Sequence, residues 1–186
     1  MPKGLLRWRV TFGFVFAGWY LWVARPASLP LFAVTAVLVM IGGALRSWAA
    51  GYLFKGKRVA VGGPYAFVRN PLYLGSFIIG IGCCIALWRV PLPPAALALW
   101  AAFLIAYGLV YPAKARAEEG ELKASLAGPY ETYARQVPAF LPWRGRVTGL
   151  GVQHFSRELY RRNQEYQCLL GCLGILGLLL FKYFYA

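Results

Sequence analysis

The chain has 186 residues, of which 60% are hydrophobic and only 14% are charged, and its formal net charge at pH 7 is +14. A mean hydropathy of +0.54 argues against an ordinary soluble globular domain, so we expect an integral membrane protein. The Lys and Arg residues lie between apolar runs rather than along one face. This distribution indicates that the basic residues contact the anionic membrane surface rather than nucleic acid.

Apolar runs follow one another along the chain, at residues 10–24, 29–54, 71–88, 92–111 and 166–185. They predict an all-α integral membrane protein with about five transmembrane helices and a cytosolic cofactor pocket formed by loops and short helices. We divide the chain into N-terminal transmembrane helices at 1–54, a core with two more helices at 55–143, and a basic interfacial segment with a last transmembrane helix at 144–186.

The basic residues are distributed unevenly between the two ends of these runs. If successive runs cross in alternate directions, most basic residues fall on one side, and the other side keeps only Arg25, Arg89 and Lys182. The basic side of a membrane protein is usually cytoplasmic. We therefore expect a multi-pass protein of the inner or plasma membrane with its active site on the cytoplasmic face.

Arg46 lies inside the second apolar run. An arginine at such a position is costly unless it is paired or reaches toward the interface, so it is a functional candidate. Reaching toward the basic end of the run at Lys55 explains it equally well. The four cysteines lie within apolar runs, and the single histidine is His154, so we expect buried thiols and no metal site.

Residues 62–75 read Gly-Gly-Pro-Tyr-Ala-Phe-Val-Arg-Asn-Pro-Leu-Tyr-Leu-Gly. This pattern predicts a turn and then a helix, with Asn70 as N-cap and Pro71 as the first helical residue. A helix start beside Arg69 suits an anion, either a carboxylate or a phosphate. The competing interpretation is an interfacial anchor, with Arg69 on lipid phosphates and Tyr65 and Tyr73 in an aromatic belt.

Three of the six acidic residues of the chain stand within four positions, at Glu118, Glu119 and Glu121. We expect them on a helix that continues the fourth apolar run. Glu119 and Lys123 fit an ordinary i,i+4 pair on a solvated face, but carboxylates at the membrane edge of a basic protein also suit a bound cation. Residues 126–142 then predict a turn, a short helix and a strap fixed by prolines.

Together, five motifs in this order and spacing closely resemble the isoprenylcysteine carboxyl methyltransferase and phospholipid methyltransferase group of integral-membrane enzymes. The resemblance covers roughly residues 45–143. The motifs are Gly63-Pro64-Tyr65, Arg69-x-Pro71-x-Tyr73, Arg116-x-Glu118-Glu119, Gly128-Pro129-Tyr130-x-x-Tyr133 and Pro138-x-x-x-Pro142. The chain departs from the carboxyl methyltransferases at Asn70, where they have His, and at Lys57, where they often have His.

The resemblance implies S-adenosylmethionine as the methyl donor and a hydrophobic small-molecule or lipidated acceptor that arrives from the bilayer. Either carboxyl O-methylation or amine N-methylation fits. Glu118 and Arg116 are the catalytic candidates, and Arg116 and Arg46 are the candidates for binding the acceptor. Membrane lipids are the other expected partners, with no nucleic acid and no metal. The cofactor-binding candidates are Lys57, Ala60, Tyr65, Arg69, Asn70, Pro71, Leu72, Tyr73 and Glu119.

The charges of the donor agree with this assignment. S-adenosylmethionine carries a sulfonium, an ammonium and a carboxylate; Arg69 and the adjoining helix start suit the carboxylate, and the Glu118–Glu119 pair suits the cationic or hydroxyl-bearing parts. An amine acceptor would also need a base, for which these two glutamates are the first candidates.

Two other functions remain open. Sterol and steroid reductases have a similar Arg-x-Pro-x-Tyr element, so the chain could be an NADPH-dependent membrane reductase, although the phosphate of NADPH would call for basic residues where the acidic cluster stands. The third possibility is a non-catalytic lipid-binding scaffold, in which every motif is a cap or an anchor.

Overall fold

The structure is a computed structural model that describes residues 17–54, 58–143 and 152–185. Within these ranges it is helical and contains no strand. The residues that it leaves undescribed include Lys57 and the beginning of the first predicted span. The all-α prediction is confirmed for the described part of the chain.

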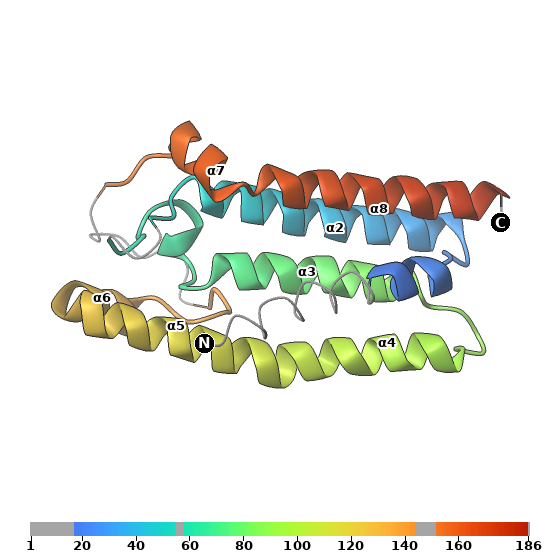
Figure 1. The fold of residues 1–186 in the computed structure, drawn as a ribbon, viewed down its shortest axis with the longest axis horizontal. Helices are drawn as coiled ribbons and strands as arrows, with labels where there is room; N and C mark the ends of the chain where they lie inside the picture. The colour runs from blue at the N-terminus through green and yellow to red at the C-terminus, as the bar shows by residue number, and fades with distance from the viewer. Residues whose placement is uncertain (1–16, 55–57, 144–151, 186) are drawn as a thin grey trace, which may run out of the picture.

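Long helices that reverse direction from one to the next form the body of the molecule (Figure 1). They are α2 (Leu29–Ala50), α3 (Pro71–Ile85), α4 (Pro94–Ile105) and α8 (Tyr166–Tyr185). A π-helical stretch, η2 (Ala106–Val110), joins α4 to α5 (Tyr111–Ser125). The acidic cluster therefore does continue the fourth apolar run as a helix.

Short elements gather at one end of these helices (Figure 1). They are η1 (Gly63–Ala66), α6 (Ala127–Gln136) and α7 (Arg157–Asn163). Residues 126–142 form the predicted short helix followed by an extended strap. All the predicted site motifs in the described residues therefore lie toward this end.

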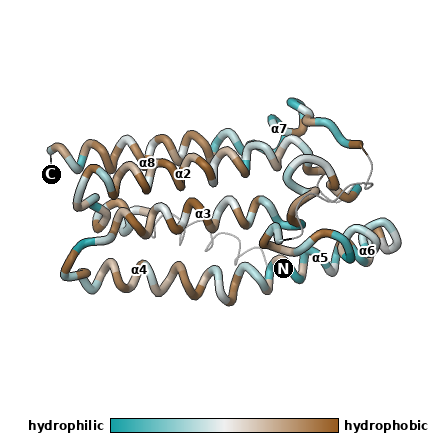
Figure 2. Tube along the Cα trace, turned by 180° about the vertical axis from the view of Figure 1, so that it is seen from behind, coloured by the Kyte–Doolittle hydropathy of each residue, from teal (hydrophilic) through white to brown (hydrophobic). Residues whose placement is uncertain are grey.

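In the described residues, three helices are long and apolar enough to cross a membrane: Leu29–Ala50, Pro94–Ser125 and Tyr166–Tyr185. Apolar residues are spread along α2, α4 and α8, whereas α5 is largely hydrophilic (Figure 2), and many large apolar side chains on α2, α4 and α8 are exposed, as lipid-facing side chains would be. The helix α3 is apolar but has 15 residues, about 22 Å at the usual rise per residue. The fold thus supports three of the five predicted spans by length and composition.

The helix α2 is the centre of the packing, because it contacts both α3 and α8. Gly42 on α2 and Gly75 on α3 face each other so closely that a Cβ on Gly42 would lie 2.5 Å from the carbonyl oxygen of Gly75. One turn before Gly42 on α2, Val39 is buried against Cys172 and Leu176 of α8. Small residues at such crossings let helix backbones approach closely.

The end opposite the short elements is closed by side-chain and backbone contacts. Lys182 near the end of α8 donates hydrogen bonds to the carbonyl oxygens of Leu21 at 2.5 Å and Trp22 at 3.1 Å. Tyr20 donates to the carbonyl oxygen of Cys83 at 3.0 Å. Leu87, Leu99 and Leu179 are buried in the same cluster. The two ends of the bundle therefore differ. The end near Lys182 is packed with apolar side chains, and the end with the short elements carries the polar side chains.

Candidate functional site

A cavity of ≈ 660 Å³ lies at the polar end, where α2 ends, α3 begins and α5 passes beside them. Most of the predicted site residues line it, although they come from separate parts of the sequence. Those that line it are Arg46, Ala60, Tyr65, Arg69, Asn70, Pro71, Leu72, Tyr73, Glu118 and Glu119. The fold therefore brings ten predicted residues to one place.

The charges in this cavity are balanced, although the chain as a whole is strongly basic. Four of the six acidic residues of the chain line it together with four basic residues: Glu118, Glu119, Glu121 and Glu165 with Arg46, Arg58, Arg69 and Lys114. Charges of both signs on one wall suit a ligand that itself carries both signs.

Glu119 connects α5 to the start of α3. Its Oε1 accepts a hydrogen bond from Asn70 Nδ2 at 3.0 Å and lies 3.3 Å from Arg69 Nε. The side chains of Arg69 and Glu119 are each 17% exposed, so the charges are largely shielded from water. The i,i+4 pair of Glu119 with Lys123 is not among the ion pairs of the described residues.

Asn70 stands at the N-cap position of α3, as predicted, but its side chain does not cap the helix. Its Nδ2 instead donates to Glu119 and to the carbonyl oxygen of Ala139 at 3.2 Å. The backbone N–H groups of Arg69 and Asn70 donate to Pro138 and Ala139 at 2.8 and 3.1 Å. The proline strap is thus held directly against the helix start, and this tertiary contact replaces the local cap.

Tyr73 and Glu118 form a second contact between α3 and α5. The Tyr73 hydroxyl donates to Glu118 Oε1 at 2.8 Å, and Lys114 Nζ lies 3.9 Å from the same oxygen. The Tyr73 ring packs edge-on against Tyr111, with 5.4 Å between ring centroids. Glu118 is about half exposed, so this carboxylate meets solvent at the rim of the cavity.

Arg46 is paired, and its partner comes from the far end of the sequence. Its guanidinium makes hydrogen bonds of 2.8 to 3.0 Å with both carboxylate oxygens of Glu165. It also donates to the Leu72 carbonyl oxygen at 3.1 Å and to the Ser76 hydroxyl. An arginine in an apolar helix is tolerated when it is paired in this way.

Glu165 lines the cavity and was not among the residues that the sequence analysis selected. It directly precedes the last apolar run and lies in the tail that the family resemblance does not cover. The available signal was the scarcity of acidic residues: one of only six stands directly before an apolar run, in a protein that has an arginine inside another apolar run.

Tyr65 places a hydroxyl in the cavity wall without a hydrogen-bond partner among the described residues. Burial is the main cause that raises the pKa of this hydroxyl above its ordinary value, and the negative charge of Glu165 adds to it. Its backbone is fixed because the Tyr133 hydroxyl donates to the Tyr65 carbonyl oxygen at 2.9 Å. A buried polar group without a partner in a cavity wall is well placed to bond a ligand.

Tyr130 and Tyr133 on α6 also line the cavity and are themselves buried. Burial and the neighbouring charge of Glu119 raise the pKa of Tyr130 to about 12. Burial likewise raises the pKa of Tyr133. The hydroxyl groups of Tyr65, Tyr130 and Tyr133 therefore stay protonated at neutral pH and act as neutral donors and acceptors.

The loop that carries Ala60 is held by the C-terminal segment. The side-chain oxygen of Gln153 accepts from the N–H groups of Val61 and Gly62 at 2.9 and 3.0 Å. Its Nε2 donates to the Val59 carbonyl oxygen at 3.0 Å. Gly63 follows with φ +54, and a Cβ there would meet the ring of Tyr52 at 2.5 Å, so this turn needs glycine.

Arg116 lies apart from the other predicted residues. It is exposed and does not line the cavity, and its Nε donates to the Pro112 carbonyl oxygen at 3.2 Å within its own helix. The described residues contain no group of three or more His, Cys, Asp or Glu placed to hold a metal ion. Lys57, the remaining predicted residue, lies outside the described ranges.

No family model matches the chain, and no solved structure gives a significant match. A partial match of 34% identity over 82 residues relates it to methanethiol S-methyltransferase of Crocosphaera subtropica (strain ATCC 51142 / BH68), covering 44% of this chain and 28% of that protein. The name of that protein denotes a methyl transfer, in agreement with the class of enzyme that the motifs resemble.

Two further matches cover most of the chain. The cobalt-zinc-cadmium resistance protein CzcN of Cupriavidus metallidurans is 32% identical over 165 residues, which is 82% of this chain and 72% of that protein. The nickel-cobalt-cadmium resistance protein NccN of Alcaligenes xylosoxydans xylosoxydans is 30% identical over 165 residues, which is 82% of this chain and 73% of that protein. On this identity and coverage, the chain belongs to the family of the resistance proteins CzcN and NccN.

Proposed function

We propose that this protein is an integral-membrane methyltransferase that uses S-adenosylmethionine and methylates a lipid or isoprenoid-linked acceptor. The observation that carries the proposal is the charge-balanced cavity, which gathers the donor motifs of the family resemblance and four of the chain's six acidic residues. The partial likeness to a methanethiol S-methyltransferase supports the same class of reaction and adds a thiol to the carboxylate and amine as acceptor groups.

The residues in the cavity fit the donor by their chemistry. Arg69 and the start of α3 suit its carboxylate, and Glu119 suits its ammonium or ribose hydroxyl groups. The unpartnered hydroxyl of Tyr65 offers one more hydrogen bond. When bound, S-adenosylmethionine supplies an electrophilic methyl group, which an acceptor takes by direct displacement.

The protein's own part in such a transfer is to align the acceptor and to exclude water. No covalent nucleophile is needed. Glu118, at the cavity rim on Tyr73, is placed to accept a proton if the acceptor is an amine. We propose the cytoplasmic face as the side on which the donor enters, because the basic residues surround that end of the helices.

Donor binding is the first test. Calorimetric titration of the detergent-purified protein with S-adenosylhomocysteine should show saturable binding. Glu119→Gln and Tyr73→Ala should each weaken it about tenfold or more, because a hydrogen bond to a charged group contributes roughly 1.5–3 kcal/mol. Glu131→Gln is the matched control, since Glu131 is exposed on α6 and does not line the cavity.

The alternatives give different outcomes in the same titration. Binding of NADPH without S-adenosylhomocysteine would replace the methyltransferase with a reductase. If the protein shows a normal melting transition but binds neither ligand, the result would favour the lipid-binding scaffold. Once donor binding is established, transfer of a labelled methyl group into a membrane lipid extract identifies the acceptor class.

The names of CzcN and NccN favour a physiological role for this chemistry in resistance to cobalt, zinc, cadmium or nickel. A strain that lacks the protein should then become sensitive to one or more of these metals, and the wild-type gene should restore growth. Glu119→Gln should fail to restore it when expressed at the same level. If the wild-type and Glu119→Gln genes restored growth equally, metal resistance would not depend on the proposed methyl transfer.

A further inference from the structure

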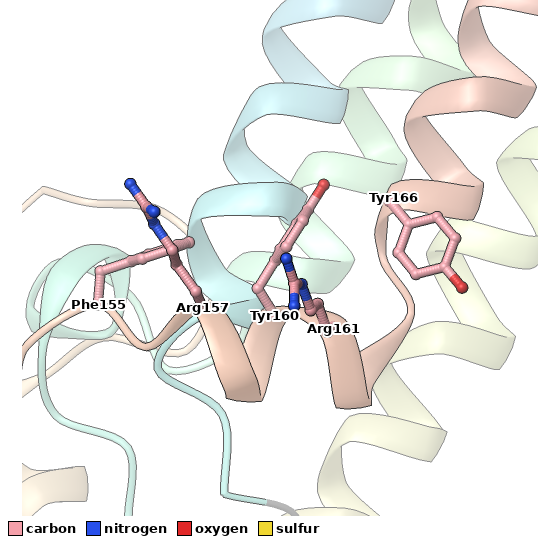
Figure 3. Close-up of a pocket in the computed structure, with 5 residues that line it drawn as sticks. All are labelled: Phe155, Arg157, Tyr160, Arg161 and Tyr166. Atoms are coloured by element: carbon pink, nitrogen blue, oxygen red, sulfur yellow. The ribbon is translucent and has the colours of Figure 1, made fainter.

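A second cleft, of ≈ 770 Å³, lies outside the cavity described above, at the corner between α7 and α8. It is lined by Phe155, Arg157, Tyr160, Arg161 and Tyr166 (Figure 3). None of these residues lines the first cavity. The two sites meet in the sequence at Glu165 and Tyr166, which face the cavity and the cleft respectively.

The helix α7 has two different faces, and only one of them holds it to the protein. Leu159 is buried, and Asn163 Nδ2 donates to the carbonyl oxygens of Ala50 and Leu53 at 2.8 and 3.0 Å. Arg157 and Arg161, spaced i,i+4, are exposed on another face of the same helix and line the cleft with Tyr160 between them in sequence (Figure 3). Because Leu159 and Asn163 hold α7 in place, the positions of Arg157 and Arg161, one turn apart on its exposed face, are fixed as well.

Neither guanidinium in the cleft takes part in an ion pair with a carboxylate of the described residues. The two arginines, one turn apart on α7, and the hydroxyl groups of Tyr160 and Tyr166 give the lining of the cleft N–H and O–H donors of the kind that bind phosphate oxygens. The rings of Phe155 and Tyr166, 44% and 40% exposed, add apolar walls. The cleft therefore suits an anion attached to an apolar body.

The surface of α8 next to the cleft indicates that the apolar part of the ligand is an acyl chain of a lipid. Tyr166, Leu170 and Leu173 follow one another at i, i+4 and i+7 on α8, and all three are exposed, the leucines by 63% and 49%. The inward face of α8 is a different one, since Cys172 and Leu176 are buried against α2. An apolar stripe that starts at the cleft and runs down a helix long enough to cross a membrane would accommodate an acyl chain.

We propose that this cleft binds the headgroup phosphate of an anionic phospholipid, with Arg157 and Arg161 as the phosphate ligands and the exposed stripe of α8 against an acyl chain. Tyr160 and Tyr166 supply hydroxyl groups at the level of the headgroup. The site does not depend on the methyltransferase proposal, because it shares no residue with the first cavity.

The test is native mass spectrometry of the full-length protein in detergent with phosphatidylglycerol and phosphatidylcholine of the same acyl chains. The wild type should retain phosphatidylglycerol in preference to phosphatidylcholine. Arg157→Gln and Arg161→Gln should each weaken that retention about fivefold, as expected for one basic residue at an anionic surface, and the double variant should lose the preference. Arg162→Gln is the matched control, because Arg162 is exposed on the same helix and does not line the cleft.

Two additional arms separate this site from simpler explanations. Arg157→Lys keeps the charge but loses the planar fork, so it should retain less phosphatidylglycerol than the wild type and more than Arg157→Gln. Equal losses in the Arg162→Gln and Arg161→Gln proteins would reduce the effect to diffuse charge and overturn the proposal. Displacement of the lipid by millimolar inorganic phosphate would overturn it as well, in favour of a soluble anion. Unchanged melting temperatures confirm that the variants are folded.

Discussion

The hydroxyl of Tyr65 is buried in the cavity wall, where no described residue bonds it. An unsatisfied buried polar group costs about 1–3 kcal/mol of stability, and a ligand bound in the cavity would supply the missing bond. We expect Tyr65→Phe to leave the melting temperature unchanged or raise it, while binding of S-adenosylhomocysteine weakens several-fold. Thermal unfolding and calorimetry on the same preparation measure both effects.

A neighbouring tyrosine provides the control for this prediction. The Tyr133 hydroxyl donates to the Tyr65 carbonyl oxygen, so Tyr133→Phe removes a satisfied bond and should destabilise the protein by about 1 kcal/mol. If Tyr65→Phe weakens binding without lowering the melting temperature, while Tyr133→Phe lowers the melting temperature, the Tyr65 hydroxyl is a ligand-binding group. If Tyr65→Phe instead destabilised the protein as much as Tyr133→Phe and left binding intact, the hydroxyl would have a structural role.

The crossing of α2 and α3 determines where the charged side chains of the cavity meet. A Cβ added at Gly75 would lie 2.6 Å from Arg46 Cγ and 2.8 Å from the Gly42 carbonyl oxygen. Gly75→Ala must therefore push the two helices apart or displace Arg46, and we expect a loss of about 1–3 kcal/mol, as for other overpacked interiors. A lower melting temperature in detergent is the readout.

Glycines of α8 allow a direct comparison with this crossing. A Cβ at Gly174 would meet nothing within 4 Å, so Gly174→Ala should be neutral or stabilising by up to roughly 1 kcal/mol through helix propensity. Equal melting temperatures for Gly75→Ala and Gly174→Ala would show that the crossing tolerates a methyl group and that the close approach is unimportant.

At the scale of the whole molecule, the pair of Arg46 and Glu165 joins α2 to the start of α8 across 119 residues of sequence. Both side chains are largely buried, at 20% and 14% exposed. Removing one partner leaves the other charge without its counterpart, so we expect Glu165→Leu and Arg46→Leu each to destabilise the protein by about 2 kcal/mol or more.

A double-mutant cycle isolates the interaction from the loss of either residue alone. The variant with both substitutions should be more stable than the sum of the single effects predicts, with a coupling energy of about 1–3 kcal/mol. Strict additivity in detergent unfolding would contradict the pairing, and Arg46 would then be stabilised by the Leu72 carbonyl oxygen and Ser76 alone.

Much of the organisation of this protein follows from the sequence alone. Hydropathy predicted the last helix with the same bounds, Tyr166–Tyr185, that the structure gives, and it predicted that the acidic cluster continues the fourth run as a helix. These features depend on residues a few positions apart, whose side chains share one helix face. The order of the family motifs likewise predicted which residues gather at one end.

Tertiary structure decided the contacts that depend on residues far apart. The sequence predicted that Asn70 would cap its own helix, but its side chain bonds Glu119 and the strap, and the partner of Arg46 came from a tail outside the family motifs. Arg116 shares a helix with Glu118 and Glu119 and yet does not line the cavity. Local propensity determines which segments are helical and apolar, but the relative rotation and crossing of the packed helices determine which polar side chains meet.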